Sequence, residues 1–175
     1  METQQYSLCP KEHPANCPLR WRLSNGLGCI SHDCKVDVVT IQGNLTGDQY
    51  IRDVLQPVVF PHFDNHPLST RPVYMDDNAR THLSRAVTTY TQSEAVTSVP
   101  WPAMSPDLNP IEHIWDMLRR RIQAQEHPVQ NIRQLEAALH REWQQLSQQD
   151  IRRLTGGMRR RVGAVIQARR GCTRY

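Results

Sequence analysis

The order of short apolar runs and amphipathic stripes constrains the fold more than any other feature of this sequence. Residues 26–31 and the β-branched run 36–41 predict two strands, and residues 73–77 and 95–99 predict two more. The longer stretches between and after these runs have helical spacing. Strands that alternate with helices are typical of an α/β domain, so we expect a sheet with flanking helices.

The clearest predicted helix begins after Asn109. Asn109 is a favourable N-cap residue, and Pro110 suits the first helical position because an N–H there has no intrahelical partner. Apolar side chains recur at helical spacing along one face, at Ile111, Ile114, Trp115, Leu118 and Ile122. A second helix is predicted after Pro128, and a third over residues 149–170 with a break at Gly156-Gly157.

Two earlier segments, residues 46–60 and 78–92, are also predicted to be helical. Thr46 can cap the first of them, and Pro57 is expected to kink or end it because proline lacks the N–H that a helix interior needs. Residues 1–25 contain three prolines and few apolar side chains, so an irregular segment is predicted there.

Charge is distributed unevenly along the 175 residues. The net charge is +4, but residues 119–175 hold 13 arginines against four acids, which is +9 and leaves −5 for residues 1–118. Arginine suits phosphate because its guanidinium donates in a fixed fork. The basic end therefore predicts either a polyanionic partner or a solvated helix face, and charge alone does not decide between them.

Neither the apolar runs nor the cysteines indicate a membrane or secreted protein. No run approaches the roughly 20 apolar residues that span a bilayer, and residues 1–24 lack an apolar signal segment. The five cysteines are odd in number and irregularly spaced, so reduced thiols in an intracellular protein are predicted. Cys29, His32 and Cys34 are close enough in sequence to suggest zinc, but they lack the two ligand pairs of a structural zinc site.

Two acidic residues fall where an α/β domain collects its ligands. Asp77 ends the strand predicted over residues 73–77, and Glu112 lies in the first turn of the helix that begins at Pro110. Ligands of open α/β sheets bind beyond the carboxyl ends of the strands, and the connection between the two acids could bring both to that edge. Carboxylates bind Mg²⁺, and a pair of such ions can promote displacement at phosphorus.

Each of these acids also has a purely structural interpretation. Asp77 could cap the helix that follows, and Glu112 lies three residues after Asn109, where a capping box has its reciprocal glutamate. His82 could support the metal-binding carboxylate or could be a surface histidine on a helix. Spacing alone leaves these interpretations open.

Longer stretches around these residues resemble the catalytic blocks of Tc/mariner-superfamily transposases. Residues 101–115, WPAMSPDLNPIEHIW, resemble the last catalytic block of that family, and residues 77–82, DNARTH, resemble the second. The 34 residues between Asp77 and Glu112 agree with the spacing in the Tc branch. The GNLT sequence at 43–46 and the arginine-rich end fit as well, so the resemblance covers about residues 26 to 175.

The resemblance implies an α/β fold of the ribonuclease-H-like class, incomplete at its front, with a mixed sheet, flanking helices and a basic C-terminal helical region. It implies that Asp77 and Glu112 are the second and third catalytic acids of a DDE triad and ligands of Mg²⁺ or Mn²⁺. DNA would be the partner and substrate, with no membrane or small-molecule cofactor, and the site of action would be the nucleus. A homo-oligomer is compatible with the family.

One departure from the family pattern decides what we expect of this chain. The family's first aspartate lies on the first strand, but residues 1–24 contain no aspartate, and Asp33 or Asp37 would lie on the wrong strand. We therefore expect an N-terminally truncated DDE domain that lacks the first strand and the first metal ligand. Little or no strand transfer is expected of this chain alone.

The expected organisation has three parts: an irregular segment without family match over residues 1–25, a truncated DDE domain over 26–125, and an arginine-rich helical extension over 126–175. The predicted nucleic-acid contacts are Arg119, Arg120, Arg121, Arg159, Arg160 and Arg161. Three hypotheses follow. The chain is an inactive transposase-derived nucleic-acid-binding protein, an active enzyme completed by an upstream exon, or a non-catalytic module that binds DNA, RNA or protein through its basic helices.

Overall fold

The computed structural model describes residues 5–8, 24–64, 73–102, 105 and 108–167. Its strands are β1 (Gln5–Leu8), β2 (Ser24–Leu27), β3 (Val39–Gln42), β4 (Val73–Asp76) and β5 (Thr97–Ser98). Its helices are α1 (Gly47–Tyr50), the π-helical segment η2 (Ile51–Val59), α2 (Phe60–Asp64), α3 (Arg85–Ser93), α4 (Pro110–Gln123), α5 (Ile132–Gln144), α6 (Gln148–Gly156) and α7 (Met158–Gln167). This alternation confirms the predicted α/β class.

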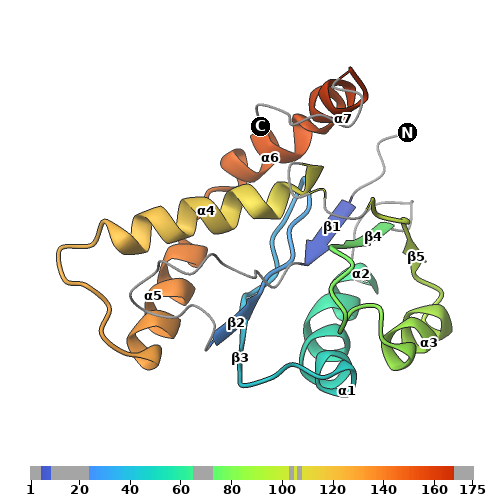
Figure 1. Cartoon of the computed structure of the whole chain (residues 1–175), viewed down its shortest axis with the longest axis horizontal. Helices are drawn as coiled ribbons and strands as arrows, with labels where there is room; N and C mark the ends of the chain where they lie inside the picture. Colours follow the sequence, from blue (N-terminus) through green and yellow to red (C-terminus); the bar gives the residue numbers. More distant parts are fainter. Residues whose placement is uncertain (1–4, 9–23, 65–72, 103–104, 106–107, 168–175) are drawn as a thin grey trace.

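The strands form a parallel group and an antiparallel hairpin (Figure 1). β4 lies between β1 and β5 and runs parallel to both. β2 and β3 pair antiparallel, with Leu27 opposite Val39. Parallel and antiparallel pairs therefore occur together, as expected for the mixed strand directions of the predicted fold.

The β2–β3 hairpin lies between two helical layers, and each layer has its own hydrophobic core. Leu27, Cys29 and Ile41 pack with side chains of α1, η2, β4 and α3. Ile30 and Val38 pack instead with α4, α5 and α6. Figure 1 shows α4 and α5 on one side of the hairpin and α1, α2 and α3 on the other. Side chains alternate between the two faces of a strand, so one hairpin contributes to both cores.

Strand β1 contradicts two predictions: that residues 1–25 are irregular, and that the strand beside β4 is missing. Residues 1–25 are not irregular throughout, because Gln5–Leu8 pair in parallel register with Val73–Asp76 and β2 begins at Ser24. The place beside β4 is therefore filled. Backbone pairing depends little on side-chain identity, so a segment without a strong apolar pattern can occupy it. The residues of β1 are Gln, Tyr, Ser and Leu, so this strand carries no acid.

The first predicted helix exists, but Pro57 does not end it. Thr46 caps α1 in a capping box, which confirms the predicted start. Pro57 lies inside η2, and the helical path continues into α2. In a π-helix each N–H bonds five residues back, as the N–H of Phe60 does with the carbonyl of Leu55. This wider turn accommodates the proline within the helix.

The second predicted helix begins later than expected. Residues 80–84 form a turn, and α3 starts at Arg85 with the Ser84 side chain as its cap. Asn78, where the helix is predicted to start, has a φ of 60°, which is left-handed and cannot belong to a right-handed helix. The start of α4 and the break between α6 and α7 agree with their predicted positions. No helix within the described ranges is long and apolar enough to cross a membrane.

A lysine joins the turn of the hairpin to the end of α5. Lys35 Nζ donates to the carbonyl oxygens of Trp143, Gln144 and Leu146 at 2.6, 3.0 and 2.7 Å. A cation is favourable at this end of a helix because the last carbonyls lack intrahelical partners. Trp143 Nε1 donates in return to the Val36 carbonyl at 2.9 Å. The hairpin and this helical layer are therefore hydrogen-bonded as well as packed.

Glycines in the hairpin let α5 approach closely. A Cβ atom at Gly28 would overlap the indole ring of Trp143, and one at Gly26 would lie 2.9 Å from Leu139 Cδ2. Trp143 is itself stacked on Trp115 of α4, with ring centroids 5.4 Å apart. The indole therefore has little freedom to move away from an added methyl group.

Replacing Gly28 with alanine is expected to destabilise the fold by about 1–3 kcal/mol, because the new methyl group must displace a buried indole. The matched control is Gly163→Ala, where an added Cβ meets no atom within 4 Å and alanine favours the helix interior by up to ~1 kcal/mol. Urea unfolding of both variants measures the difference. Equal stability of Gly28→Ala and the wild-type chain would contradict the close packing at the hairpin.

Candidate functional site

Two consecutive acids lie at the carboxyl end of β4. Tyr74 and Met75 are buried within the strand, Asp76 ends it, and Asp77 follows directly. Pairing with β1 on one side and β5 on the other fixes where β4 ends. The predicted position of Asp77 at a strand end is therefore confirmed, and it is the kind of position where α/β domains bind ligands.

A left-handed turn after β4 orients both carboxylates. Asn78 has a φ of 60°, which asparagine tolerates better than most residues. Its N–H donates to Asp76 Oδ1 at 2.9 Å, and the N–H of Ala79 donates to Asp77 Oδ1 at 3.0 Å. The Asn78 side chain donates from Nδ2 to the Trp101 carbonyl at 2.7 Å, which ties the turn to the segment leading into α4. Local bonds thus fix the carboxylates relative to the backbone.

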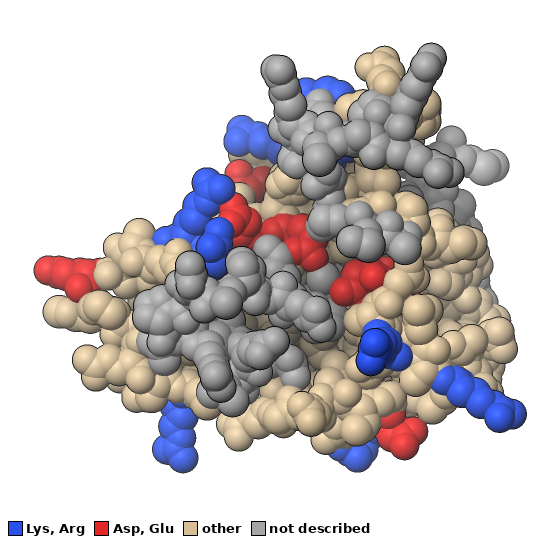
Figure 2. Space-filling view, in the orientation of Figure 1, with Lys and Arg blue, Asp and Glu red and all other residues tan. Residues whose placement is uncertain are grey.

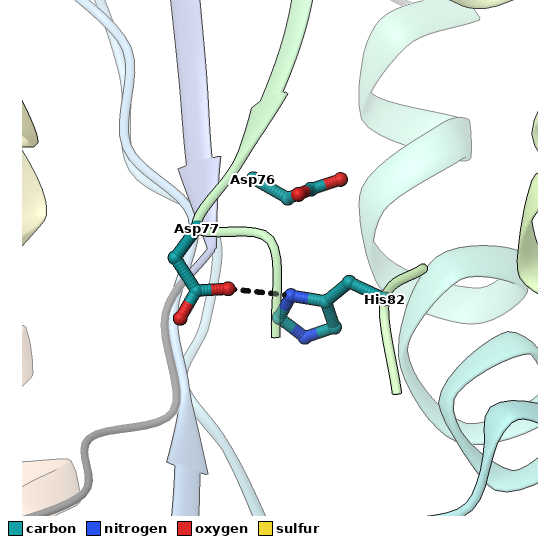
Figure 3. A group of neighbouring side chains, drawn as sticks. All are labelled: Asp76, Asp77 and His82. Carbon is teal, nitrogen blue, oxygen red and sulfur yellow. Dashed lines mark hydrogen bonds and ion pairs between the residues drawn. The ribbon is translucent and has the colours of Figure 1, made fainter. Parts of the chain in front are cut away.

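His82 contacts Asp77 from the turn that precedes α3. Its Nδ1 lies 2.8 Å from Asp77 Oδ1, and its side chain is 0% exposed, whereas that of Asp77 is 19% exposed. The imidazole stacks on the ring of Tyr50, with centroids 4.5 Å apart. Figure 3 shows the ring directed at Asp77, with Asp76 close by. The interpretation of His82 as a surface histidine is therefore wrong, and the structure places the imidazole in hydrogen-bond contact with Asp77.

A pair of buried tyrosines lies behind the imidazole. The hydroxyls of Tyr50 and Tyr74 are 2.7 Å apart and share a hydrogen bond. Burial raises the pKa of both phenols well above the ordinary value, and the negative charge of Asp76 raises the pKa of each further. Both hydroxyls are therefore protonated at neutral pH, and the pair forms an uncharged wall beside His82.

The side chains at the end of β4 offer ligand atoms to a hard cation. One ligand atom from each of Asp76, Asp77 and His82 lies within 4.8 Å of the other two. Carboxylate oxygens are the ligands that Mg²⁺ and Mn²⁺ prefer, so the donor set fits either ion. Asp76 was not among the ligands predicted from the sequence. Two consecutive acids at a strand end are the signal that could have indicated it.

Glu112, the other predicted ligand, is half-buried in the first turn of α4. α4 contacts β1, the neighbour of β4. The segment before α4 is bonded to β4 through the Val99 N–H, which donates to the Tyr74 carbonyl at 3.1 Å. It is bonded to the turn after β4 through the Trp101 carbonyl, which accepts from the Asn78 side chain. Figure 2 shows acidic side chains gathered near the middle of this face, over the region where α4 begins beside β1 and β4 in Figure 1. These contacts connect the start of α4 with the end of β4.

Two of the predicted nucleic-acid contacts on α4 are already paired with an acid. Arg119 and Arg120 each have a guanidinium nitrogen 2.6 Å from a carboxylate oxygen of Asp116. Arg121 is half-buried on the same helix. A phosphate would therefore have to compete with the Asp116 carboxylate for Arg119 and Arg120.

The arginines on α7 divide into exposed and buried side chains. Arg159 and Arg160 are exposed, as a contact with DNA requires. Arg161 is only 4% exposed and donates from Nη2 to the Leu154 carbonyl of α6. Arg161 therefore does not lie at the surface where its predicted contact with nucleic acid would form, because successive residues on a helix point in different directions and Arg161 faces α6.

The residues considered for zinc are bonded to other partners. His32 Nδ1 lies 3.1 Å from a threonine hydroxyl of α6, whereas Cys34 Sγ lies 2.9 Å from His62 Nε2. Among the described residues, the acids and His82 at the end of β4 are the one group of three ligands close enough to share a metal ion. Neither Cys29 nor Cys34 forms a disulfide, and burial raises the pKa of Cys29. The other cysteines lie outside the described residues.

Comparison with known families agrees with the geometry at the end of β4. A model described as "DDE superfamily endonuclease" matches residues 6–136 of the chain. The chain therefore belongs to the DDE superfamily of endonucleases. The match begins within β1, so the prediction that residues 1–25 have no family match is wrong.

Within this superfamily the chain is similar to Tc1/mariner transposases. It is 31% identical over 174 residues to the Tcb1 transposase of Caenorhabditis briggsae, a match that covers 98% of this chain and 59% of that protein. It is 37% identical over 105 residues to the Tc1 transposase of Caenorhabditis elegans, covering 59% of this chain and 37% of that protein. The chain thus spans less than two thirds of the length of these curated relatives.

The fold is that of the catalytic domain of the Mos1 mariner transposase. The two structures superpose with a TM-score of 0.77 at 14% sequence identity, covering 94% of this chain and 81% of the other. Other Mos1 structures with TM-scores of 0.75 to 0.76 are described as containing Mn or Mg, or as a paired-end complex with the left transposon end. The predicted ribonuclease-H-like fold class is therefore confirmed.

Asn78→Ala is expected to destabilise the chain by about 2–3 kcal/mol. Alanine loses the bond to the Trp101 carbonyl, worth ~1 kcal/mol, and is disfavoured by a further 1–2 kcal/mol, roughly, at a φ of 60°. Asn78→Gly loses the same hydrogen bond, but glycine adopts a φ of 60° without strain, so the free energy of unfolding should fall by only about 1 kcal/mol. Thermal and urea unfolding measure both variants. If glycine is as damaging as alanine, backbone conformation is not the reason for asparagine here.

Proposed function

We propose that this chain is the catalytic-domain portion of a Tc1/mariner-type transposase that binds a divalent cation through Asp77 and Glu112 and binds DNA through exposed arginines. The observation that carries the proposal is the fixed carboxylate of Asp77 at the end of the central parallel strand, bonded to Ala79 N–H and to His82. Family membership supports the reaction class. Because the chain spans only part of its relatives, the activity of a whole transposase is part of the proposal.

The residues present fit a hard divalent ion. Asp77 supplies one oxygen ligand, Glu112 is proposed as a second from the start of α4, and Asp76 adds carboxylate charge beside Asp77. When bound, Mg²⁺ or Mn²⁺ would activate an attacking hydroxyl and stabilise the leaving oxygen at phosphorus. The protein's own contribution is to hold the carboxylates in one arrangement. Mos1 structures described with Mn and with Mg support the choice of ion.

Strand transfer by this chain alone is proposed to be weak or absent. The strand β1 lies beside β4, but its residues are Gln, Tyr, Ser and Leu, and residues 1–24 contain no aspartate. Without an acid from this strand, the ions would be held with fewer ligands and placed less well. A Mg²⁺-dependent nicking activity that Asp77→Ala and Glu112→Ala both abolish would overturn this part of the proposal.

DNA contact is proposed for the exposed arginines of α7, with Arg119, Arg120 and Arg121 of α4 as further contacts. Arg159 and Arg160 are exposed on a helix that follows the domain core, and guanidinium groups pair well with phosphate. A paired-end complex of Mos1 supports a homo-oligomer assembled on DNA, and action on chromosomal DNA would place the protein in the nucleus. The division at residue 125 between a DDE domain and a helical extension remains part of the proposal.

The alternative function is a non-catalytic module that binds DNA, RNA or protein through its basic helices. The exposed arginines of α6 and α7 favour this alternative even if the metal site is inactive. The two proposals share nucleic-acid binding and differ at Asp77 and Glu112, so metal binding separates them.

Mn²⁺ binding to the 175-residue chain is expected to weaken at least about tenfold in Asp77→Asn and in Glu112→Gln, because each removes a charged oxygen ligand. The matched control is Asp116→Asn, an acid on α4 whose carboxylate is paired with Arg119 and Arg120. Electron paramagnetic resonance of free Mn²⁺ gives the affinities. Unchanged binding in both ligand variants would refute the metal site and favour the non-catalytic module.

The double variant Arg159→Ala, Arg160→Ala is expected to bind a DNA duplex more weakly than the wild-type chain. The slope of log affinity against log salt concentration should become shallower by up to about 2. The matched control is the pair Arg52→Ala and Arg133→Ala, which removes the same charge from other exposed positions. Fluorescence anisotropy at several salt concentrations measures both. Equal losses in the two double variants would show that net charge, and not a contact surface on α7, determines binding.

A further inference from the structure

The burial of the His82 imidazole is unfavourable in free energy. The residue is 2% exposed, its side chain is fully buried, and one face of the ring is stacked on Tyr50. Its Nε2 is buried and, among the described residues, has no hydrogen-bond partner. An unpartnered buried nitrogen is unfavourable, and an apolar side chain of similar size would avoid the penalty. The burial of His82 is therefore not explained by packing.

The hydrogen bond to Asp77 explains why an imidazole is present. An ionised carboxylate can only accept, so the proton of the 2.8 Å contact belongs to His82 Nδ1. Asp77 Oδ1 accepts a second bond from the Ala79 N–H at 3.0 Å. Two donors on one oxygen fix both the position and the rotation of the carboxylate, which one backbone bond alone would not do.

We propose that His82 is a positioning residue that orients Asp77 for a divalent cation. This inference rests on the proposed function of Asp77 as a metal ligand. Partners that lock a ligating carboxylate or imidazole are known to control metal affinity strongly, because they remove the freedom that the ligand would lose on binding. His82 acts here through Nδ1 on Asp77 and need not touch the ion or the DNA.

The surroundings of His82 hold the ring in this orientation. Tyr50 covers one face, and its hydroxyl is fixed by the bond to Tyr74 at 2.7 Å. The neighbouring Thr81 hydroxyl donates to the Leu45 carbonyl at 3.2 Å, which attaches this turn to the segment before α1. Tyr50 at the end of α1 and the Leu45 carbonyl before α1 thus hold the ring and the turn that carries it.

Three substitutions separate positioning from packing. The amide nitrogen of asparagine lies at the same number of bonds from Cα as His Nδ1, and that of glutamine at the same number as Nε2. His82→Asn is therefore expected to keep Mn²⁺ affinity within about threefold, whereas His82→Gln and His82→Leu should lose roughly 10- to 100-fold. His82→Leu removes the unpartnered nitrogen together with the hydrogen bond to Asp77, so its melting temperature should stay close to that of the wild type.

The result that would overturn the inference is Mn²⁺ affinity that is equal in all three variants, or that follows their melting temperatures instead of the chemistry at position 82. Val59→Ala disturbs the same hydrophobic core from η2 and should retain metal affinity, which makes it the matched control for a disturbed core. If asparagine at position 82 preserves Mn²⁺ affinity and glutamine does not, packing alone does not explain the difference.

A second readout does not depend on metal. ¹⁵N NMR of the histidine ring should show a protonated Nδ1 and an unprotonated Nε2 in the wild-type chain, and loss of that preference in Asp77→Ala. A ring protonated at Nε2 alone would overturn the positioning role even if metal binds. If the wild-type chain binds no Mn²⁺, the proposed function fails, and the tautomer alone then decides whether His82 holds Asp77.

Discussion

The position of the β4 end is the constraint on which the candidate site depends. β4 is paired on both sides, with β1 and with β5, so its carboxyl end cannot shift without breaking backbone bonds on two strands. The turn at Asn78 then fixes two carboxylates within a few residues, and its side chain bonds to Trp101 on the way to α4. A short strand and a left-handed residue thus bring acids, imidazole and the start of α4 into one region.

The close packing of the hairpin supports this arrangement from a distance. The absence of a side chain at Gly28 lets Trp143 lie against the hairpin just after β2, and Lys35 bonds to the end of α5. The hairpin in turn contributes Leu27 and Ile41 to the core that surrounds Tyr74 of β4. The layer that carries α4 and the layer that carries β4 are therefore linked through one hairpin.

Features that depend on neighbouring residues in the sequence could be predicted. Features that depend on contacts with residues far away in the sequence could not. Thr46 and Asn109 are caps whose side chains bond to their own helices, so pattern alone located both starts. β1 was missed because strand pairing is made by backbone groups of β4 and not by a pattern in residues 5–8. The burial of Arg161 was missed because its acceptor, a carbonyl of α6, is supplied by tertiary packing. The burial of His82 is likewise set by tertiary contacts with Asp77 and Tyr50, which the sequence pattern does not show.

Asp77 and Glu112 are proposed to hold a divalent cation together, and anomalous diffraction from crystals of this chain grown with Mn²⁺ would locate that ion. We expect an anomalous peak between the carboxylates of Asp77 and Glu112, with His82 Nδ1 still bonded to Asp77. A peak bound to Asp76 and His82 in place of that bond, or no peak at this end of β4, would contradict it.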